Sequence, residues 1–193
     1  MNTRETMLMA ALRLLEQEGE ARFSTRAVCD VANVTAPTLY HHFGNADGLL
    51  SAVLTEGFRQ LLASKNLAEQ SSDARVALCE GWDDYVRFAA ERPRLYAAMM
   101  TRFLQGASIP AAEEAFAVLR QQVAALEAEG RLAIAASDAA SVMWAAANAA
   151  ALLYATATLQ PTTHILAPDG PVVDAIRDQA VASICKPRPA NQA

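Results

Sequence analysis

Residues 34–43 of the 193-residue chain read V-T-A-P-T-L-Y-H-H-F, and this stretch predicts the recognition helix of a helix-turn-helix. Thr35 is a favourable N-cap, because its hydroxyl can accept a hydrogen bond from a first-turn N–H group. Pro37 falls in that first turn, where its missing N–H costs nothing. Leu39 and Phe43 are four residues apart and share one helical face, which we expect to anchor the helix.

The opposite face of this helix is polar and aromatic. It carries Thr35, Ala36, Pro37, Tyr40 and His41, with His42 at its flank. A phenol hydroxyl and an imidazole N–H are both hydrogen-bond donors, and such donors suit a surface that meets phosphates. The sequence therefore predicts that this face binds DNA.

A second short helix precedes the recognition helix. Ser24 is its expected N-cap, and its apolar face is formed by Ala27, Val28, Val31 and Ala32. The turn is Ala32-Asn33-Val34, in which Asn tolerates the left-handed conformation that such a turn often requires. Two short helices joined by a tight turn fit a DNA-reading element whose second helix enters the major groove.

Residues 3–54 resemble the DNA-binding domain of the TetR family of bacterial regulators. Residues 23–43 read F-S-T-R-A-V-C-D-V-A-N-V-T-A-P-T-L-Y-H-H-F and match that family's helix-turn-helix almost position for position. The preceding A-L-R-L-L-E-Q-E-G and the following L-L-S-A-V-L fit as well. The resemblance implies that bases or the adjacent backbone face Thr25, Arg26, Ala36, Pro37 and Thr38. It also implies that Tyr40 and His42 hold phosphates.

The chain departs from the family pattern at three positions. Asn33 stands in the turn where the family often has Gly. Ala46 stands just after the recognition helix, where the family often has a Lys that touches phosphate. Ala36 replaces longer polar residues, so base readout there is expected to be apolar at best.

Composition favours an all-α fold. The chain is 53% hydrophobic, with Ala dominating and Gly scarce, and contains no alternating run that predicts a strand. Its formal net charge is −5, and residues 1–46 hold four Arg against five acidic residues. DNA binding must therefore depend on local geometry rather than on bulk charge. The three Cys residues have no metal-ligand spacing and are expected to be reduced thiols in a cytoplasmic protein.

The chain divides into two predicted domains. Residues 1–64 are expected to form the helix-turn-helix domain, with a first helix over Thr3–Glu18 and a bridging fourth helix capped by Asn45. Residues 65–193 are expected to form a helical domain for ligand binding and dimerisation. The polar stretch 65–72 is the predicted connector.

The least polar stretch, residues 139–168, contains no Asp, Glu, Lys or Arg. A transmembrane helix is one interpretation. However, most of the apolar residues are Ala, polar residues interrupt them, and no basic cluster flanks the segment. The sequence instead predicts a helix that is buried on nearly all sides, and no membrane partner.

The last two helices are expected to pair with the same helices of a second copy, because small residues let helices approach closely. They cover Ser141–Tyr154 and Pro171–Ile184, and the family resemblance implies a four-helix dimer interface there. A monomer with both helices in its own core is the alternative. The two-fold symmetry of DNA half-sites favours the dimer. Glutamate at Ala147 or Ala150 is expected to break the dimer or the fold.

Aromatic and Met residues of the second domain are candidates for a mostly apolar ligand cavity with few polar groups. They are Trp82, Tyr85, Tyr96, Met99, Met100, Phe103, Trp144, Asn148 and Tyr154. Taken singly, each is better explained by a place in the core. Residues 144–149 read W-A-A-A-N-A and resemble the W…HG signature of a C-terminal effector-domain subfamily, with Asn and Ala in place of His and Gly.

The predicted function is a homodimeric repressor that binds a palindromic operator in double-stranded DNA and is released by a small apolar effector. No catalytic constellation or metal-ligand spacing is found in the sequence, so neither an enzyme nor a cofactor is expected. The main alternative is a small-molecule-binding helical protein with weak or lost DNA binding, which the scarcity of basic residues favours. A helical-bundle enzyme ranks third.

Overall fold

The computed structural model describes residues 2–64, 71–107, 110–160, 162 and 167–187. Within these residues the secondary structure is helical, with a short 3-10 helix at Glu20–Arg22 and no strand beyond an isolated bridge between Leu132 and Cys185. The α-helices are α1 (Thr3–Glu18), α2 (Thr25–Ala32), α3 (Ala36–Phe43), α4 (Ala46–Ser64), α5 (Ala74–Glu91), α6 (Pro93–Leu104), α7 (Pro110–Ala128), α8 (Ala136–Leu159) and α9 (Gly170–Ile184). The predicted all-α fold is confirmed.

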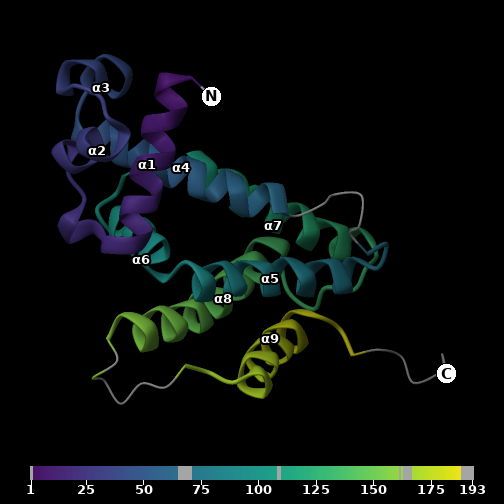
Figure 1. Cartoon of the computed structure of the whole chain (residues 1–193). Coiled ribbons are helices and arrows are strands. Elements are labelled where there is room, and N and C mark those ends of the chain that lie inside the picture. Colours follow the sequence, from purple (N-terminus) through teal and green to yellow (C-terminus); the bar gives the residue numbers. More distant parts are fainter. Residues whose placement is uncertain (1, 65–70, 108–109, 161, 163–166, 188–193) are drawn as a thin grey trace.

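Helices α1 to α3 gather at one end of the molecule (Figure 1). The Oδ1 atom of Asn2 caps α1 by accepting from the Glu5 N–H at 2.8 Å, and Ser24 caps α2 through the Ala27 N–H at 3.2 Å. Asn33 has φ 53° and ψ 50°, the left-handed conformation predicted for the turn. The Asn45 side chain accepts from the Gly48 N–H at 2.8 Å and caps α4 as expected.

Helices α4 and α6 join this end to the rest of the molecule (Figure 1). One core cluster contains the buried apolar residues of α1 to α4 together with Leu95, Ala98 and Met99 of α6. At Gly57 an added Cβ would come within 2.6 Å of a Leu95 methyl group, so glycine allows α4 and α6 to pack closely. The core is therefore continuous across the predicted division at residues 64 and 65. Most of the predicted connector lies outside the described residues.

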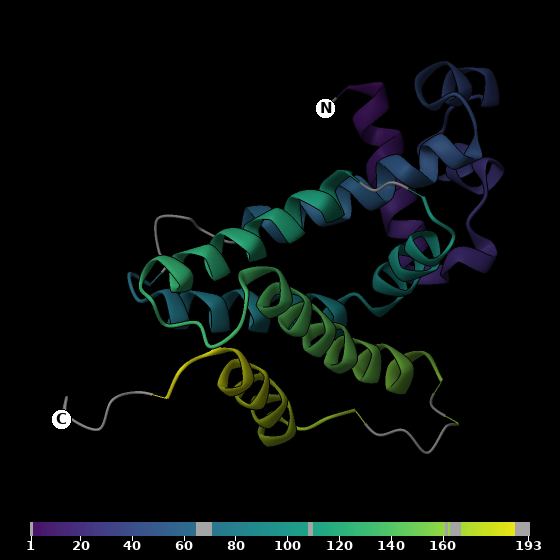
Figure 2. The ribbon, with the colours of Figure 1, turned by 180° about the vertical axis from the view of Figure 1, so that it is seen from behind.

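The second core lies among α5, α7, α8 and α9, with α8 also contacting α6 (Figure 2). Helix α8 is long and apolar enough to cross a membrane by length and composition, and 28% of its most apolar window is buried. The prediction that α8 is buried on nearly all sides is wrong for the protomer. Ala140, Met143 and Ala147 face the core, whereas Ala149 and Leu152 are exposed. Four helices cover the rest of α8, and the remaining stripe has no partner in the described chain.

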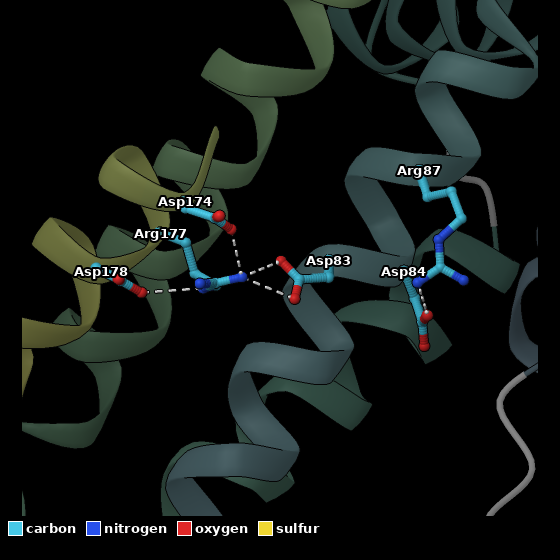
Figure 3. Close-up of polar contacts among 6 residues, drawn as sticks. All are labelled: Asp83, Asp84, Arg87, Asp174, Arg177 and Asp178. Carbon is cyan, nitrogen blue, oxygen red and sulfur yellow. Dashed lines mark hydrogen bonds and ion pairs between the residues drawn. The ribbon is translucent and has the colours of Figure 1, made fainter. Parts of the chain in front are cut away.

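Helix α9 is fastened to α5 by Arg177, whose side chain is 18% exposed (Figure 3). Its Nη1 donates to both carboxylate oxygens of Asp83 at 2.9 Å. The same guanidinium contacts Asp174 at 3.0 Å and Asp178 at 3.1 Å within α9. Because a guanidinium presents donors in a fixed planar arrangement, these contacts help to orient α9 against α5, beside the apolar packing of Ala180, Val181 and Ile184.

Candidate nucleic-acid interface and ligand cavity

The recognition helix α3 is anchored by one face and exposes the other. Leu39 is 0% and Phe43 is 9% exposed, as their spacing predicted. The residues predicted to meet DNA are at the surface of α2 and α3. Thr25 and Thr38 are half-buried, and the exposed ones are Arg26, Thr35, Ala36, Pro37, Tyr40, His41 and His42. All nine therefore lie on one accessible region.

The hydroxyl groups of α2 and α3 hold the two helices in register. Thr25 Oγ1 and Tyr40 Oη lie 3.4 Å apart, within hydrogen-bond distance. Tyr40 is 44% exposed, so its phenol remains accessible from outside. A phosphate near this pair would meet the hydroxyl that does not donate within the pair, together with the N-terminal end of α2.

The prediction that the Thr35 hydroxyl accepts from a backbone N–H is wrong. Thr35 is the N-cap residue of α3, but its hydroxyl pairs with Thr38 Oγ1 at 2.9 Å. Two β-branched residues three positions apart bring their hydroxyls together here. The first turn of α3 therefore has no side-chain cap, and its N–H groups stay available for a ligand.

The structure adds Arg4 to this surface, which sequence reasoning missed. The Arg4 guanidinium carbon lies 5.1 Å from the centre of the Phe43 ring. That ring lies edge-on to His42, with ring centres 6.5 Å apart. Arg4 is exposed and supplies a full positive charge at the C-terminal end of the recognition helix. Periodicity gives no signal for this contact, because packing alone brings the start of α1 beside α3.

Ala46 begins α4 close to the same end of α3, only three residues after Phe43, and is exposed. A longer basic side chain at this position would extend from the same surface as His42 and Arg4. The apolar residue leaves Arg4 as the full positive charge placed at this end of α3. The DNA-facing surface is therefore only weakly basic.

A cavity of about 890 Å³ lies among α4 to α8. Its size falls in the range of sites that take drug-sized ligands. Six of the nine predicted ligand residues line it: Trp82, Tyr85, Met99, Met100, Phe103 and Trp144. Sequence reasoning missed wall residues from α4 and α7, among them Phe58 and Phe116. Apolar periodicity alone predicts only that such residues face inward on their helices, and only packing distinguishes a core from a cavity wall.

The other three predicted ligand residues lie outside the cavity wall. Tyr154 packs against the core of α5, α7, α8 and α9. Asn148 accepts hydrogen bonds through Oδ1 from Tyr85 at 2.9 Å and from Tyr96 at 3.2 Å. Its Nδ2 donates to the Trp144 carbonyl at 2.9 Å. The amide is therefore engaged within the protein and fixes the position of Tyr85 at the edge of the cavity.

Burial makes both tyrosine hydroxyls still harder to deprotonate than a free tyrosine. Desolvation raises the pKa of Tyr85 well above its usual value, with a smaller effect from Tyr96. Desolvation also raises the pKa of Tyr96 to about 12. Both groups remain hydrogen-bond donors at neutral pH, so this small network is neutral.

An accessible helix-turn-helix joined to a helical domain with an apolar cavity defines the class of helix-turn-helix transcriptional regulators. Residues 7–53 match the family model described as bacterial regulatory proteins, tetR family. The tetracycline repressor protein class G of Vibrio anguillarum is 36% identical over 75 residues, which are 39% of this chain and 35% of that protein. The chain thus aligns with about a third of this curated relative's length.

Solved structures share the complete fold. A protein of unknown function from Rhodococcus sp. RHA1 superposes with a TM-score of 0.78 at 25% identity, covering 96% of this chain and 97% of that one. A TetR family transcription regulator from Marinobacter aquaeolei VT8 has a TM-score of 0.70 at 17% identity, with 96% of each chain covered. The match over residues 7–53 supports a regulator of the TetR family, and the solved structures show that the whole chain shares their fold. This family consists of transcriptional regulators, which are not enzymes.

Proposed function

We propose that the protein is a cytoplasmic repressor that binds a palindromic DNA operator as a homodimer and leaves it when a small apolar molecule fills the cavity. The name of the Vibrio relative, a tetracycline repressor, supports repression controlled by a small molecule. Helix α6 carries the proposal, because it lines the cavity and also packs against α1 and α4 of the DNA-binding end. Met99, Met100 and Phe103 of α6 line the cavity.

The same helix α6, with Arg92 just before it, is ion-paired to the DNA-binding end. Arg92 pairs with Glu16 of α1, and Arg94 donates to the Glu16 carbonyl at 3.2 Å. Arg102 pairs with Asp47 in the first turn of α4. A ligand that displaces Met99 or Phe103 would therefore move the contacts that hold α1 and α4. Ligand binding would change DNA affinity by some factor, and DNA would change ligand affinity by the same factor.

The exposed stripe on α8 is the proposed dimer interface, together with the exposed face of α9. On α8 it comprises Ala149 and Leu152, and on α9 it comprises Val172, Ala175, Gln179 and Ala182. Leu152 is 57% and Val172 is 47% exposed in the protomer. The small residues on these faces of α8 and α9 would allow the helices of two subunits to approach closely. Two-fold symmetry would then present two recognition helices to a palindromic operator.

The operator can be sought directly. Purified protein would be mixed with fragments of the genomic DNA of its source organism, and the retained fragments would be sequenced. Recovery of one palindromic sequence supports the proposal, and Arg26→Ala protein serves as the control that should recover it poorly. The alternative, a ligand-binding protein with lost DNA binding, is favoured by the weakly basic surface around Ala46. This alternative predicts that no DNA sequence is enriched, although the protein still binds small molecules.

Substitutions in the recognition surface should separate two kinds of DNA contact. Tyr40→Phe or His42→Ala is expected to weaken binding to all sequences alike, since these side chains would hold phosphate. Arg26→Ala should instead relax base preference, by about 1–3 kcal/mol at one position if the contact is bidentate to guanine. Affinities for the operator and for unrelated DNA would be measured for each variant. If Tyr40→Phe changed sequence preference and left nonspecific affinity unchanged, the two roles would be reversed.

A further inference from the structure

The cavity favours a neutral ligand. Its wall is largely aromatic and apolar, and no charged side chain is fully buried in the described part of the chain. Glu113 and Arg120 line it as well, but both are exposed and their charges are opposite. A charged molecule inside would lose hydration without meeting a buried counter-charge, which is costly.

Several polar groups of the wall are already engaged. Tyr85 Oη donates to Asn148 at 2.9 Å. Gln122 Nε2 donates to the Ala77 carbonyl at 3.0 Å, and Ser141 Oγ donates to the Ser137 carbonyl at 2.9 Å. The Tyr85 and Ser141 hydroxyls have one O–H each and cannot donate to a ligand without losing an existing hydrogen bond, and Gln122 has one of its two amide N–H groups engaged.

The indole N–H of Trp82 differs from these groups. Trp82 lines the cavity and is only 3% exposed. Its Nε1 is buried and has no hydrogen-bond partner among the described residues. Buried donors in folded proteins are nearly always paired, and leaving one unpaired is unfavourable. Because Nε1 is covered by neighbouring atoms, an acceptor on a bound molecule reaches it only when the ligand displaces part of the wall, and that acceptor would then be stabilised.

We infer that the cavity binds a neutral, ring-containing organic molecule whose carbonyl or ether oxygen accepts a hydrogen bond from Trp82 Nε1. Rings fit the wall, because Phe103 and Trp144 both line the cavity, with ring centres 5.8 Å apart, and offer aromatic surface to a ligand. Met99 and Met100 add side chains that adapt to ligand shape. This inference rests on the cavity being the ligand site of the proposed function, and it adds the chemical class of that ligand.

Three naphthalenes of similar size test the inference on the full chain without DNA. They are 2-acetylnaphthalene, which has a carbonyl acceptor, 2-ethylnaphthalene, which has none, and 2-naphthoate, which is an anion. Trp82→Phe removes the N–H and keeps an aromatic ring. Trp144→Phe is the matched control, because it removes the other indole of the cavity wall.

Each variant is compared with the wild type for the same probe, so differences in hydration between the probes cancel. We expect Trp82→Phe to weaken 2-acetylnaphthalene about fivefold, the effect of one net hydrogen bond, and to change 2-ethylnaphthalene less than about twofold. Trp144→Phe should affect both probes alike. Equal effects of Trp82→Phe on both probes, or tighter binding of 2-naphthoate than of 2-acetylnaphthalene, would overturn the inference.

A second measurement needs no substitution at Trp82. In ¹⁵N-labelled wild-type protein, the Trp82 indole N–H resonance should move downfield with 2-acetylnaphthalene and much less with 2-ethylnaphthalene. The Trp144→Phe variant identifies which indole signal is which. An unmoved signal under saturating 2-acetylnaphthalene would contradict the hydrogen bond. These readouts involve no DNA, so a failure of the repressor proposal would leave them unchanged.

Discussion

Ala150→Glu is expected to unfold the part of the molecule that α5, α7, α8 and α9 form. Ala150 is 0% exposed and belongs to the core formed by α5, α7, α8 and α9. Glutamate there would bury a carboxylate without a partner, at a cost of several kcal/mol in the free energy of folding. This is comparable to the whole stability of a typical domain, which is about 5–15 kcal/mol. Circular dichroism should show loss of helix or of the cooperative thermal transition.

Ala149→Glu, one residue away, is expected to separate the subunits and leave the fold intact. Ala149 is exposed on the stripe of α8 that contains Leu152, so the new carboxylate meets water in the protomer. In the proposed dimer the same carboxylate would be buried against a second copy. Sedimentation at micromolar concentration should give a dimer for the wild type and a monomer for Ala149→Glu, with unchanged circular dichroism.

The matched control is Ala21→Glu, which adds the same charge at an exposed residue outside α8 and α9. It should leave the dimer unchanged. A monomeric wild type at micromolar concentration would end the dimer proposal. The sequence predicts that glutamate at Ala147 or Ala150 breaks the dimer or the fold. The structure shows that both residues face the core of their own protomer. Their substitution tests the fold.

The affinity of the protein for DNA is expected to depend only weakly on salt. Each phosphate neutralised by Lys or Arg adds about 0.9 to the slope of log affinity against log salt concentration. Tyr40, His42, Thr hydroxyls and helix N–H groups contribute little full charge to the proposed interface. Ala46→Lys should tighten binding to every sequence and steepen the slope by up to about two units, one per subunit. Operator affinity would be measured across a salt series for both proteins.

Substitution of Arg4 tests the opposite change, the removal of a positive charge from the same surface. If its guanidinium reaches a phosphate in each subunit, Arg4→Ala should lower the slope by up to about two units and weaken all sequences alike. Arg13→Ala is the control, since Arg13 lies on α1 away from Phe43 and donates to the Met9 carbonyl at 3.3 Å. A steep wild-type slope that neither Ala46→Lys nor Arg4→Ala changes would show that other basic residues hold the DNA.

Local sequence signals predicted the DNA-binding end with few errors. Asn33 adopts the left-handed turn, Ser24 and Asn45 cap their helices, and Leu39 and Phe43 anchor α3. Each of these depends on residues within about one helical turn, which is why pattern and spacing suffice. The Thr35 cap failed because its hydroxyl had a second partner, Thr38, that the same spacing also allows.

The cavity and the exposed stripe of α8 were less predictable. Periodicity shows that a residue faces inward or outward on its own helix, but it does not show what lies opposite. Tyr96 and Tyr85 have the same aromatic signature, yet Tyr96 does not line the cavity and Tyr85 does. Similarly, the uniform Ala content of α8 concealed that Ala150 is buried and Ala149 is exposed.

The sequence by itself therefore determined the helical fold, the helix-turn-helix and its accessible face, because these follow from contacts between neighbours in the chain. Only the tertiary structure decided that Arg4 lies over Phe43, that the Trp82 N–H is unpaired in a cavity wall, and that α6 is attached to both ends of the molecule. These features arise where residues distant in sequence meet. Contacts of this kind depend on how whole helices pack together, which no single stretch of the sequence predicts.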